Sequence, residues 1–279
     1  MIYERIYLKE HFAALAEFDS PAYLDVYAPS QSPELGDDRR YPSVLVCPGG
    51  GYGMTSDREA EPIAFALLGR GLGAFVLRYS VAPARYPKAL LEVGAAMAYI
   101  RQNAEKYGVQ EDAISVMGFS AGGHLAGNYG THWDREVLDP LHVEKEFLRP
   151  NGLILCYGVL SFGEMTHLGS VKNLLGPDAT EEQRKALSFE HAVSESTPPT
   201  FLWHTCTDKA VPVENSLYAA EALAKFQIPF ELHVYPEGGH GLSVASWVTT
   251  RDENNLPPKY LTKWIDDCAN WVLRNAGRG

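Results

Sequence analysis

One short stretch of the chain combines a serine with closely spaced glycines, Gly118-Phe119-Ser120-Ala121-Gly122. An apolar run over 113–117 precedes it and small residues over 121–129 follow it, so the pattern predicts a strand, a sharp turn and a helix. Glycines on both sides remove side chains that would collide with the neighbouring strand and helix, which leaves the serine hydroxyl accessible. We predict that Ser120 is a nucleophile, with an incidental serine in a glycine-rich turn as the alternative.

A serine hydroxyl needs a base that accepts its proton. His240 lies between glycines in 237–241, after an expected strand over 230–235, where a loop can swing an imidazole onto Ser120. Four other histidines follow Ser120 at a useful distance. His204 and His233 lie in expected strands, and His167 and His191 lie in an irregular stretch. A catalytic base is better placed in a loop at a strand end than within a strand or an irregular stretch, so the pattern favours His240.

The acid that orients this base should end the strand before it. Asp208 directly follows an expected strand over 200–205, and the order serine, acid, histidine is the one that nucleophile-elbow hydrolases use. Glu214 and Glu237 are nearby carboxylates that do not end a strand in this way. We predict that Asp208 orients His240, and the alternative is an N-cap for the next helix.

Acyl transfer also needs backbone amides that face the developing oxyanion. The turn over 48–53, which contains three consecutive glycines, follows an expected strand and supplies such amides. We assign the donors to Gly50 and Gly51 together with Ala121, although the sequence does not distinguish the glycines of 49–51. A phosphate-binding loop is excluded, because no Gly-Lys-Ser/Thr follows and the G-x-G-x-x-G spacing is absent.

The elements that must position these residues alternate along the chain. Short apolar runs predict strands over 22–27, 43–47, 73–79, 113–117, 151–159, 200–205 and 230–235. Helical patterns cover 59–69, 89–107, 121–129, 213–226 and 260–275. The alternation predicts an α/β fold, with a mostly parallel, doubly wound sheet of about eight strands and helices on both faces.

Residues 1–279 fit a single domain, but two stretches are longer than ordinary connections. These are 131–150 and 161–199. Long excursions in compact domains often carry function, so we expect cap or pocket-wall insertions there, with peripheral helices as the alternative.

Composition excludes several classes of partner. A formal net charge of −11 disfavours nucleic acids and anionic membranes, which select basic surfaces. The first residues lack a signal-peptide pattern, and no apolar run is long enough to span a bilayer, so we expect a cytoplasmic protein. Four widely spaced cysteines predict neither a disulfide framework nor a metal site.

These strings together resemble the small α/β-hydrolase carbohydrate esterases, the BD-FAE-like lipase/esterase group that includes acetyl-xylan and feruloyl esterases. The matching strings lie at 48–52, 79–83, 118–126, 208 with 211–212, and 239–241. The resemblance implies a serine carboxylesterase that hydrolyses short acyl esters, acetyl above all, of carbohydrates, without a cofactor. Related lipase-like esterases usually carry histidine where this chain has Pro48, which favours the carbohydrate-esterase branch.

Other functions of the same fold are a serine peptidase or amidase, a lipase, and a binding protein without catalysis. The expected partner is a small acyl ester such as an acetylated oligosaccharide, and a homo-oligomer is compatible with the sequence. Aromatic residues that could stack on a sugar are Tyr52, Trp133, Phe162 and Trp247, although aromatics in such loops more often pack internally. His124, one turn into the helix after Ser120, is interpreted as structural.

Overall fold

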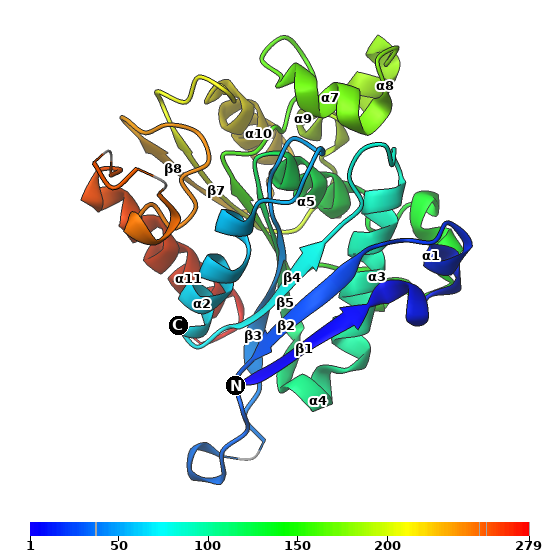
Figure 1. The fold of residues 1–279 in the computed structure, drawn as a ribbon, viewed down its shortest axis with the longest axis vertical. Coiled ribbons are helices and arrows are strands. Elements are labelled where there is room, and N and C mark those ends of the chain that lie inside the picture. The colour runs from blue at the N-terminus through cyan, green and yellow to red at the C-terminus, as the bar shows by residue number, and fades with distance from the viewer. Residues whose placement is uncertain (37, 251, 255, 279) are drawn as a thin grey trace.

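The centre of the molecule is one eight-stranded sheet with the strand order β1-β2-β4-β3-β5-β6-β7-β8 (Figure 1). This computed structural model describes residues 1–36, 38–250, 252–254 and 256–278. The strands are β1 (Ile2–Tyr7), β2 (Tyr23–Ala28), β3 (Tyr41–Cys47), β4 (Gly73–Arg78), β5 (Val109–Phe119), β6 (Gly152–Cys156), β7 (Thr200–Thr205) and β8 (Phe230–Tyr235). Strand β2 runs antiparallel to β1 and β4, and all other neighbours are parallel. The predicted mostly parallel sheet is confirmed.

The register of the parallel strands brings their carboxyl ends to a common edge. Cys47 at the end of β3 pairs with Gly118 of β5, and Phe119 pairs with Cys156 at the end of β6. Thr205 at the end of β7 pairs with Tyr235 at the end of β8. The loops after β3, β5, β7 and β8 therefore leave the sheet at one edge, where ligands bind in open α/β sheets.

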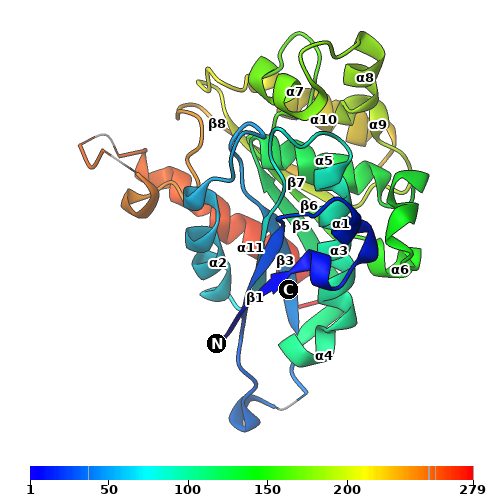
Figure 2. The same ribbon diagram turned by 45° about the vertical axis from the view of Figure 1, so that its right-hand side comes forward.

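Helices cover both faces of the sheet (Figures 1 and 2). The longer ones are α2 (Glu61–Leu68), α3 (Lys88–Gln102), α5 (Ala121–His132), α7 (Leu168–Leu175), α10 (Glu214–Lys225) and α11 (Trp264–Asn275). Helices α2 and α11 share one core with one face of the strands, and α3, α5 and α10 share a second core with the other face. In β3, Val44 and Val46 point into the first core and Leu45 into the second, as strand alternation requires.

Two expected helices differ in detail from the structure, and two elements near the N-terminus, β1 and α1, were not expected. Strand β1 carries no long apolar run and lies at the sheet edge against β2 alone, so its pattern is weak. The helix expected over 89–107 divides at Asn103 into α3 and α4 (Ala104–Tyr107). The helix expected over 260–275 begins with a 3-10 segment, Lys259–Lys263, before α11. The short helix α1 (Ala13–Glu17) lies between β1 and β2.

The two long excursions differ in where they pack. Residues 131–150 include a 3-10 segment, Glu136–Leu141, and α6 (Lys145–Leu148), and both pack against α3. Residues 161–199 contain α7, α8 (Glu181–Ala186) and α9 (Phe189–Ala192), which lie together at one end of the molecule (Figures 1 and 2). We refer to residues 161–199 as the α7–α9 segment.

Candidate active site

Ser120 occupies the turn between β5 and α5 with an unusual backbone conformation. Its φ is 53° and its ψ is −118°, values that a residue with a side chain adopts only when the surroundings hold it there. The Ser120 amide donates to the carbonyl of Cys156 over 3.0 Å, and its own carbonyl accepts from the amides of His124 and Val159. This anchoring stabilises the turn that carries the Ser120 side chain.

The glycines around Ser120 are required by close backbone approach. A Cβ atom on Gly118 would collide with the backbone of Gly122, and one on Gly122 would collide with the carbonyl oxygen of Cys47. These are backbone atoms at the meeting point of β3, β5 and α5, so they cannot move aside cheaply. The spacing of Gly118 and Gly122 around Ser120 therefore has the expected cause: a side chain at either position would collide with neighbouring backbone.

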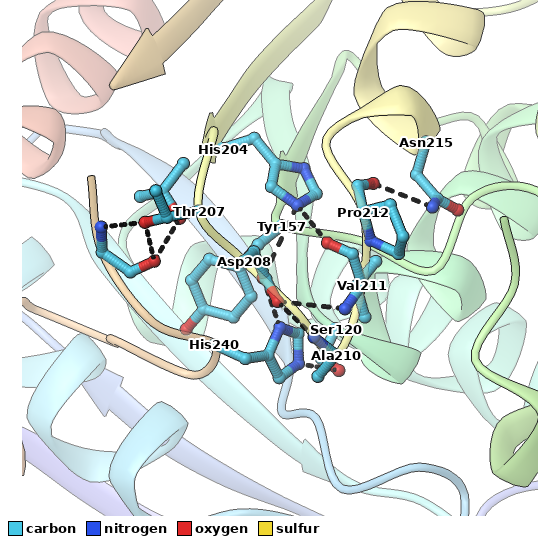
Figure 3. Close-up of polar contacts among 12 residues, drawn as sticks. Ser120, Tyr157, His204, Thr207, Asp208, Ala210, Val211, Pro212, Asn215 and His240 are labelled. Atoms are coloured by element: carbon cyan, nitrogen blue, oxygen red, sulfur yellow. Dashed lines mark hydrogen bonds and ion pairs between the residues drawn. The ribbon is translucent and has the colours of Figure 1, made fainter. Parts of the chain in front are cut away.

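The structure brings together the three side chains that were predicted to act with one another (Figure 3). Nε2 of His240 lies 2.7 Å from Oγ of Ser120, and Nδ1 of His240 lies 2.6 Å from Oδ2 of Asp208. An ionised carboxylate can only accept, so Nδ1 carries the proton and the Nε2 lone pair faces the Ser120 hydroxyl. This tautomer is the one in which His240 can accept the serine proton.

The loop after β7 holds Asp208 ionised. Its Oδ1 accepts from the amides of Ala210 at 2.9 Å and Val211 at 3.0 Å (Figure 3). Burial of this carboxylate would raise its pKa, but His204 and His240 beside it, together with the Val211 amide, lower the pKa of Asp208 well below its ordinary value. Helix α10 begins only at Glu214, so Asp208 is not its N-cap.

Three of the alternative acids and bases, namely Glu237, His233 and His204, are engaged elsewhere. Glu237 is exposed and accepts a hydrogen bond from Tyr260 at 3.1 Å. His233 pairs with Glu231 at 2.8 Å on β8. His204 is fully buried, donates from Nε2 to the carbonyl of Val211 at 2.9 Å and accepts at Nδ1 from Ser216 at 2.8 Å. His204 therefore braces the Asp208 loop from inside the core.

The glycine turn after β3 presents two backbone amides beside Ser120. Gly50 and Gly51 adopt positive φ values of 127° and 64°, which a glycine accommodates readily. The amide of Gly49 is already engaged, because it donates to Oε2 of Glu59 at 2.8 Å. The amides of Gly50, Gly51 and Ala121 have no hydrogen-bond acceptor among the residues that the structure describes. Of the three glycines in this turn, Gly50 and Gly51 are therefore the ones whose amides remain available to a ligand.

Sequence reasoning missed Glu59, which was taken only as the start of a helix. Its side chain is buried, with 2% of the residue exposed, and its Oε1 accepts from the hydroxyl of Tyr157 at 2.8 Å. The Tyr157 hydroxyl in turn accepts from the amide of Ser243 at 2.8 Å. Glu59 thus connects the turn at Gly49 to the loop that carries His240. No local pattern marks this role, because its partners come from distant parts of the chain.

A cavity of about 300 Å³ opens at these groups. Its lining residues come from the loops after β3, β5, β7 and β8 and from the α7–α9 segment: Gly50, Gly51, Met54, Ser56, Asp57, Arg58, Glu59, Ser120, His167, Ala210, His240 and Gly241. Most of the side chains are polar or charged, and Met54 supplies the one large apolar surface in this lining. The cavity therefore offers hydrogen-bonding side chains as well as some carbon surface to a small ligand.

The structure does not support the expected wall of aromatic residues. Tyr52 is 2% exposed and donates its hydroxyl to Nδ1 of His124 at 2.7 Å, and Phe162 stacks on His124 at 4.1 Å between ring centroids. Burial lowers the pKa of His124 to about 3, which keeps this structural histidine neutral. Tyr52 and Phe162 thus pack around His124 in the interior of the molecule.

The two tryptophans also lie outside the cavity lining. Trp133 follows α5, whereas Ser120 precedes it, so the 12-residue helix separates the two by about 18 Å. Its indole donates to the carbonyl of Ser196 at 3.0 Å. Trp247 is 68% exposed. Residues 131–150 contribute nothing to the cavity, so the expectation of a pocket wall there is not met.

Comparison with known proteins assigns the chain to a family. Residues 24–223 match the BD-FAE family model. The protein named endo-1,4-beta-xylanase B from Butyrivibrio fibrisolvens is 41% identical over 216 residues, which are 75% of this chain and 34% of that protein. The chain belongs to the BD-FAE family.

Two further relatives support the same assignment. An acetylxylan esterase from Xylanibacter ruminicola is 28% identical over 236 residues, 82% of this chain and 45% of that protein. The crystal structure of an acetyl ester-xyloside bifunctional hydrolase from Caldicellulosiruptor lactoaceticus matches with a TM-score of 0.79 and 38% identity, covering 92% of this chain and 89% of that one. This BD-FAE family member is thus an α/β-hydrolase related to carboxylic ester hydrolases. It spans between a third and a half of the length of the two curated relatives.

Among the described residues, no group of three or more histidine, cysteine, aspartate or glutamate side chains is arranged to hold a metal ion. No helix in the described ranges is both long and apolar enough to cross a bilayer. The cytoplasmic location stays a prediction.

Proposed function

We propose that this BD-FAE family member is a serine carboxylesterase that removes acetyl and other short acyl groups from carbohydrate alcohols. The observation that carries the proposal is the arrangement of Ser120, His240 and Asp208 at 2.7 Å and 2.6 Å, beside the amides of Gly50, Gly51 and Ala121. A nucleophile, a base, an orienting acid and oxyanion donors at one cavity are the parts that acyl transfer requires.

In the first step, Oγ of Ser120 attacks the ester carbonyl carbon while Nε2 of His240 takes the serine proton. The carbonyl oxygen becomes an oxyanion, which the amides of Ala121 and of Gly50 or Gly51 stabilise. Asp208 stabilises the imidazolium that forms on His240. His240 then gives the proton to the alcohol oxygen as the bond between carbonyl carbon and alcohol oxygen breaks, leaving an acyl group on Ser120.

In the second step, a water molecule takes the place of the alcohol. His240 accepts a proton from the water as its oxygen attacks the acyl carbon, and the same amides stabilise the second oxyanion. The proton then returns to Oγ of Ser120 as the acyl bond breaks. The products are a carboxylic acid and the free enzyme, so no cofactor enters either step.

The lining of the cavity supports short acyl groups and polar alcohols. A long acyl chain needs an extended apolar surface, whereas Met54 is the one large apolar side chain in this 300 Å³ cavity. Polar groups such as Ser56, Asp57 and Arg58 instead suit the hydroxyl groups of a sugar. The names of the relatives, which refer to xylan, xylosides and acetyl esters, favour the same substrates.

We also propose that the α7–α9 segment forms a cap over the site. His167 supports this proposal, since it is the member of this segment that lines the cavity. A cap of this kind would exclude bulk water from one side of the bound ester.

An acyl-chain series of p-nitrophenyl esters beside acetylated xylo-oligosaccharides tests the proposal. We expect kcat/KM to be highest for acetate and to fall with chain length, with acetate released from the oligosaccharides. Rates that rise beyond about eight carbons would instead indicate a lipase. Faster turnover of amides than of acetyl esters would indicate a peptidase or amidase. If simple aryl acetates alone are hydrolysed, the carbohydrate part of the proposal fails.

A further inference from the structure

His167 is a second histidine in the cavity, and the mechanism above does not use it. It comes from the α7–α9 segment, immediately before α7, and lines the cavity together with Ser120 and His240. Its Cε1 atom would lie 3.6 Å from a Cβ atom on Gly51, so its ring packs against the proposed oxyanion turn. His167 is therefore close enough to the reacting ester to contact the substrate.

The hydrogen bonds of His167 determine which of its nitrogens carries a proton. Nδ1 accepts from the backbone amide of Ser170 at 3.2 Å and lies 2.9 Å from the Ser170 hydroxyl. A backbone N–H group can only donate, so Nδ1 is unprotonated and the proton of the neutral ring is on Nε2. Burial, and then the neighbouring His240, lower the pKa of His167, which favours the neutral form.

Nε2 of His167 is consequently a donor without an acceptor among the described residues. It is not an alternative base, because its lone pair is on Nδ1 and is used by Ser170. When a substrate binds, it displaces the water that accepts a hydrogen bond from a donor at the cavity wall. The substrate must then supply an acceptor atom, because an unpaired donor costs binding free energy.

The proposed mechanism leaves few substrate atoms that could accept this hydrogen bond. The carbonyl oxygen faces the amides of the oxyanion site, and the ester oxygen faces Nε2 of His240. An acetyl methyl group offers no acceptor. Hydroxyl and ring oxygens of the alcohol are what remains, and they are present in a sugar ester but absent from an aryl acetate.

On this basis, and resting on the proposed function, we propose that His167 is a specificity residue whose Nε2–H donates to an oxygen of the sugar near the ester bond. His167 selects carbohydrate acetates over acetates of simple alcohols and phenols. The rate of the chemical step itself does not depend on it.

The test compares His167→Phe with the wild type on acetylated xylobiose and on p-nitrophenyl acetate. The variant should lose about five- to tenfold in kcat/KM on the sugar ester, mainly through a higher KM, and stay within about twofold on the aryl ester. His167→Asn retains an N-cap acceptor for the Ser170 amide but places no donor at Nε2, so it should show the same selective loss. His191→Phe is the matched control, because His191 is an exposed histidine of the same segment outside this cavity.

Three results would overturn the inference. Equal losses on both substrates would mean that His167 acts on the carbonyl oxygen or on the fold, and unchanged kcat/KM on both would mean that it does not touch the sugar. If His167→Asn kept the wild-type kcat/KM on the sugar ester while His167→Phe lost it, the effect would come from the N-cap of α7 and not from the Nε2 donor. A wild-type enzyme that hydrolyses neither acetate would refute the proposed function instead, and that outcome is visible before any variant is compared.

Discussion

The buried carboxylate of Glu59 accepts a hydrogen bond from the backbone amide of Gly49 over 2.8 Å. The other oxygen of Glu59 accepts a hydrogen bond from the Tyr157 hydroxyl. That hydroxyl accepts a hydrogen bond from the backbone amide of Ser243, in the loop after His240. One side chain thus connects the proposed oxyanion turn with the loop of the proposed base. Both halves of the site depend on the position of this carboxylate.

Glu59→Ala should therefore impair both stability and turnover. It leaves the Gly49 amide and the Tyr157 hydroxyl without their acceptor, and we expect the free energy of unfolding to fall by about 2 to 4 kcal/mol. We expect kcat to fall at least about tenfold, because Gly50 and Gly51 lose the anchor beside them. Urea unfolding and p-nitrophenyl acetate turnover measure the two effects. Glu61→Ala, at an exposed position two residues later, is the control, and equal behaviour of the two variants would refute this role.

Asp208→Asn should retain the fold and lose most of the activity. The amide can still accept from Ala210 and Val211, but it no longer favours the His240 tautomer with the proton on Nδ1. We expect kcat to fall by about 10³- to 10⁴-fold, measured with p-nitrophenyl acetate. Glu237→Gln should remain near the wild-type rate. If Glu237→Gln lost the activity and Asp208→Asn kept it, Glu237 would be the acid instead of Asp208.

The buried His124 should make the stability of the folded protein depend on pH in the acidic range. Its pKa in the folded protein is about 3, below the ordinary value of 6.5, so between these values the unfolded chain binds a proton that the folded chain does not. The stabilisation is complete above pH 6.5 and is lost as the pH falls toward 3, by about 1.4 kcal/mol per pH unit. The difference in unfolding free energy between wild type and His124→Leu should therefore shrink below pH 6.5 in urea titrations. A difference that does not vary with pH would contradict this account.

Gly122→Ala should prevent stable folding, because its Cβ atom would collide with the carbonyl oxygens of Cys47 and Pro48. Gly239→Ala is the matched control from the same site. Among the described residues no atom lies within 4 Å of a Cβ atom added there, so the unfolding free energy should change by less than about 0.5 kcal/mol. Circular dichroism and thermal unfolding would distinguish the two, and a cooperatively folded Gly122→Ala would show that the turn can widen.

Much of this molecule could be predicted because its signals are local. Apolar runs predicted every strand except β1, and strand ends predicted where Ser120, Asp208 and His240 would lie. Because β3, β5, β6, β7 and β8 run parallel, the loops after β3, β5, β7 and β8 lie at the same edge of the sheet. Glycines with a steric purpose, such as Gly118 and Gly122, could also be recognised from their spacing alone.

The features that could not be predicted depend on contacts between distant segments. Glu59 meets Tyr157, 98 residues away, and Tyr52 meets His124, 72 residues away. An aromatic ring in a loop can face solvent or fill a core, and contacts with His124 and Tyr79 make Tyr52 internal. For the same reason His167, a residue of an irregular stretch, could not be placed in the cavity.

The most direct test of the central claim is labelling with a fluorophosphonate, followed by intact-protein mass spectrometry and peptide mapping. The account predicts one adduct per wild-type chain, located on Ser120, with much slower labelling of His240→Ala and none of a folded Ser120→Ala. An unlabelled wild-type protein, or an adduct that persists in Ser120→Ala, would contradict it.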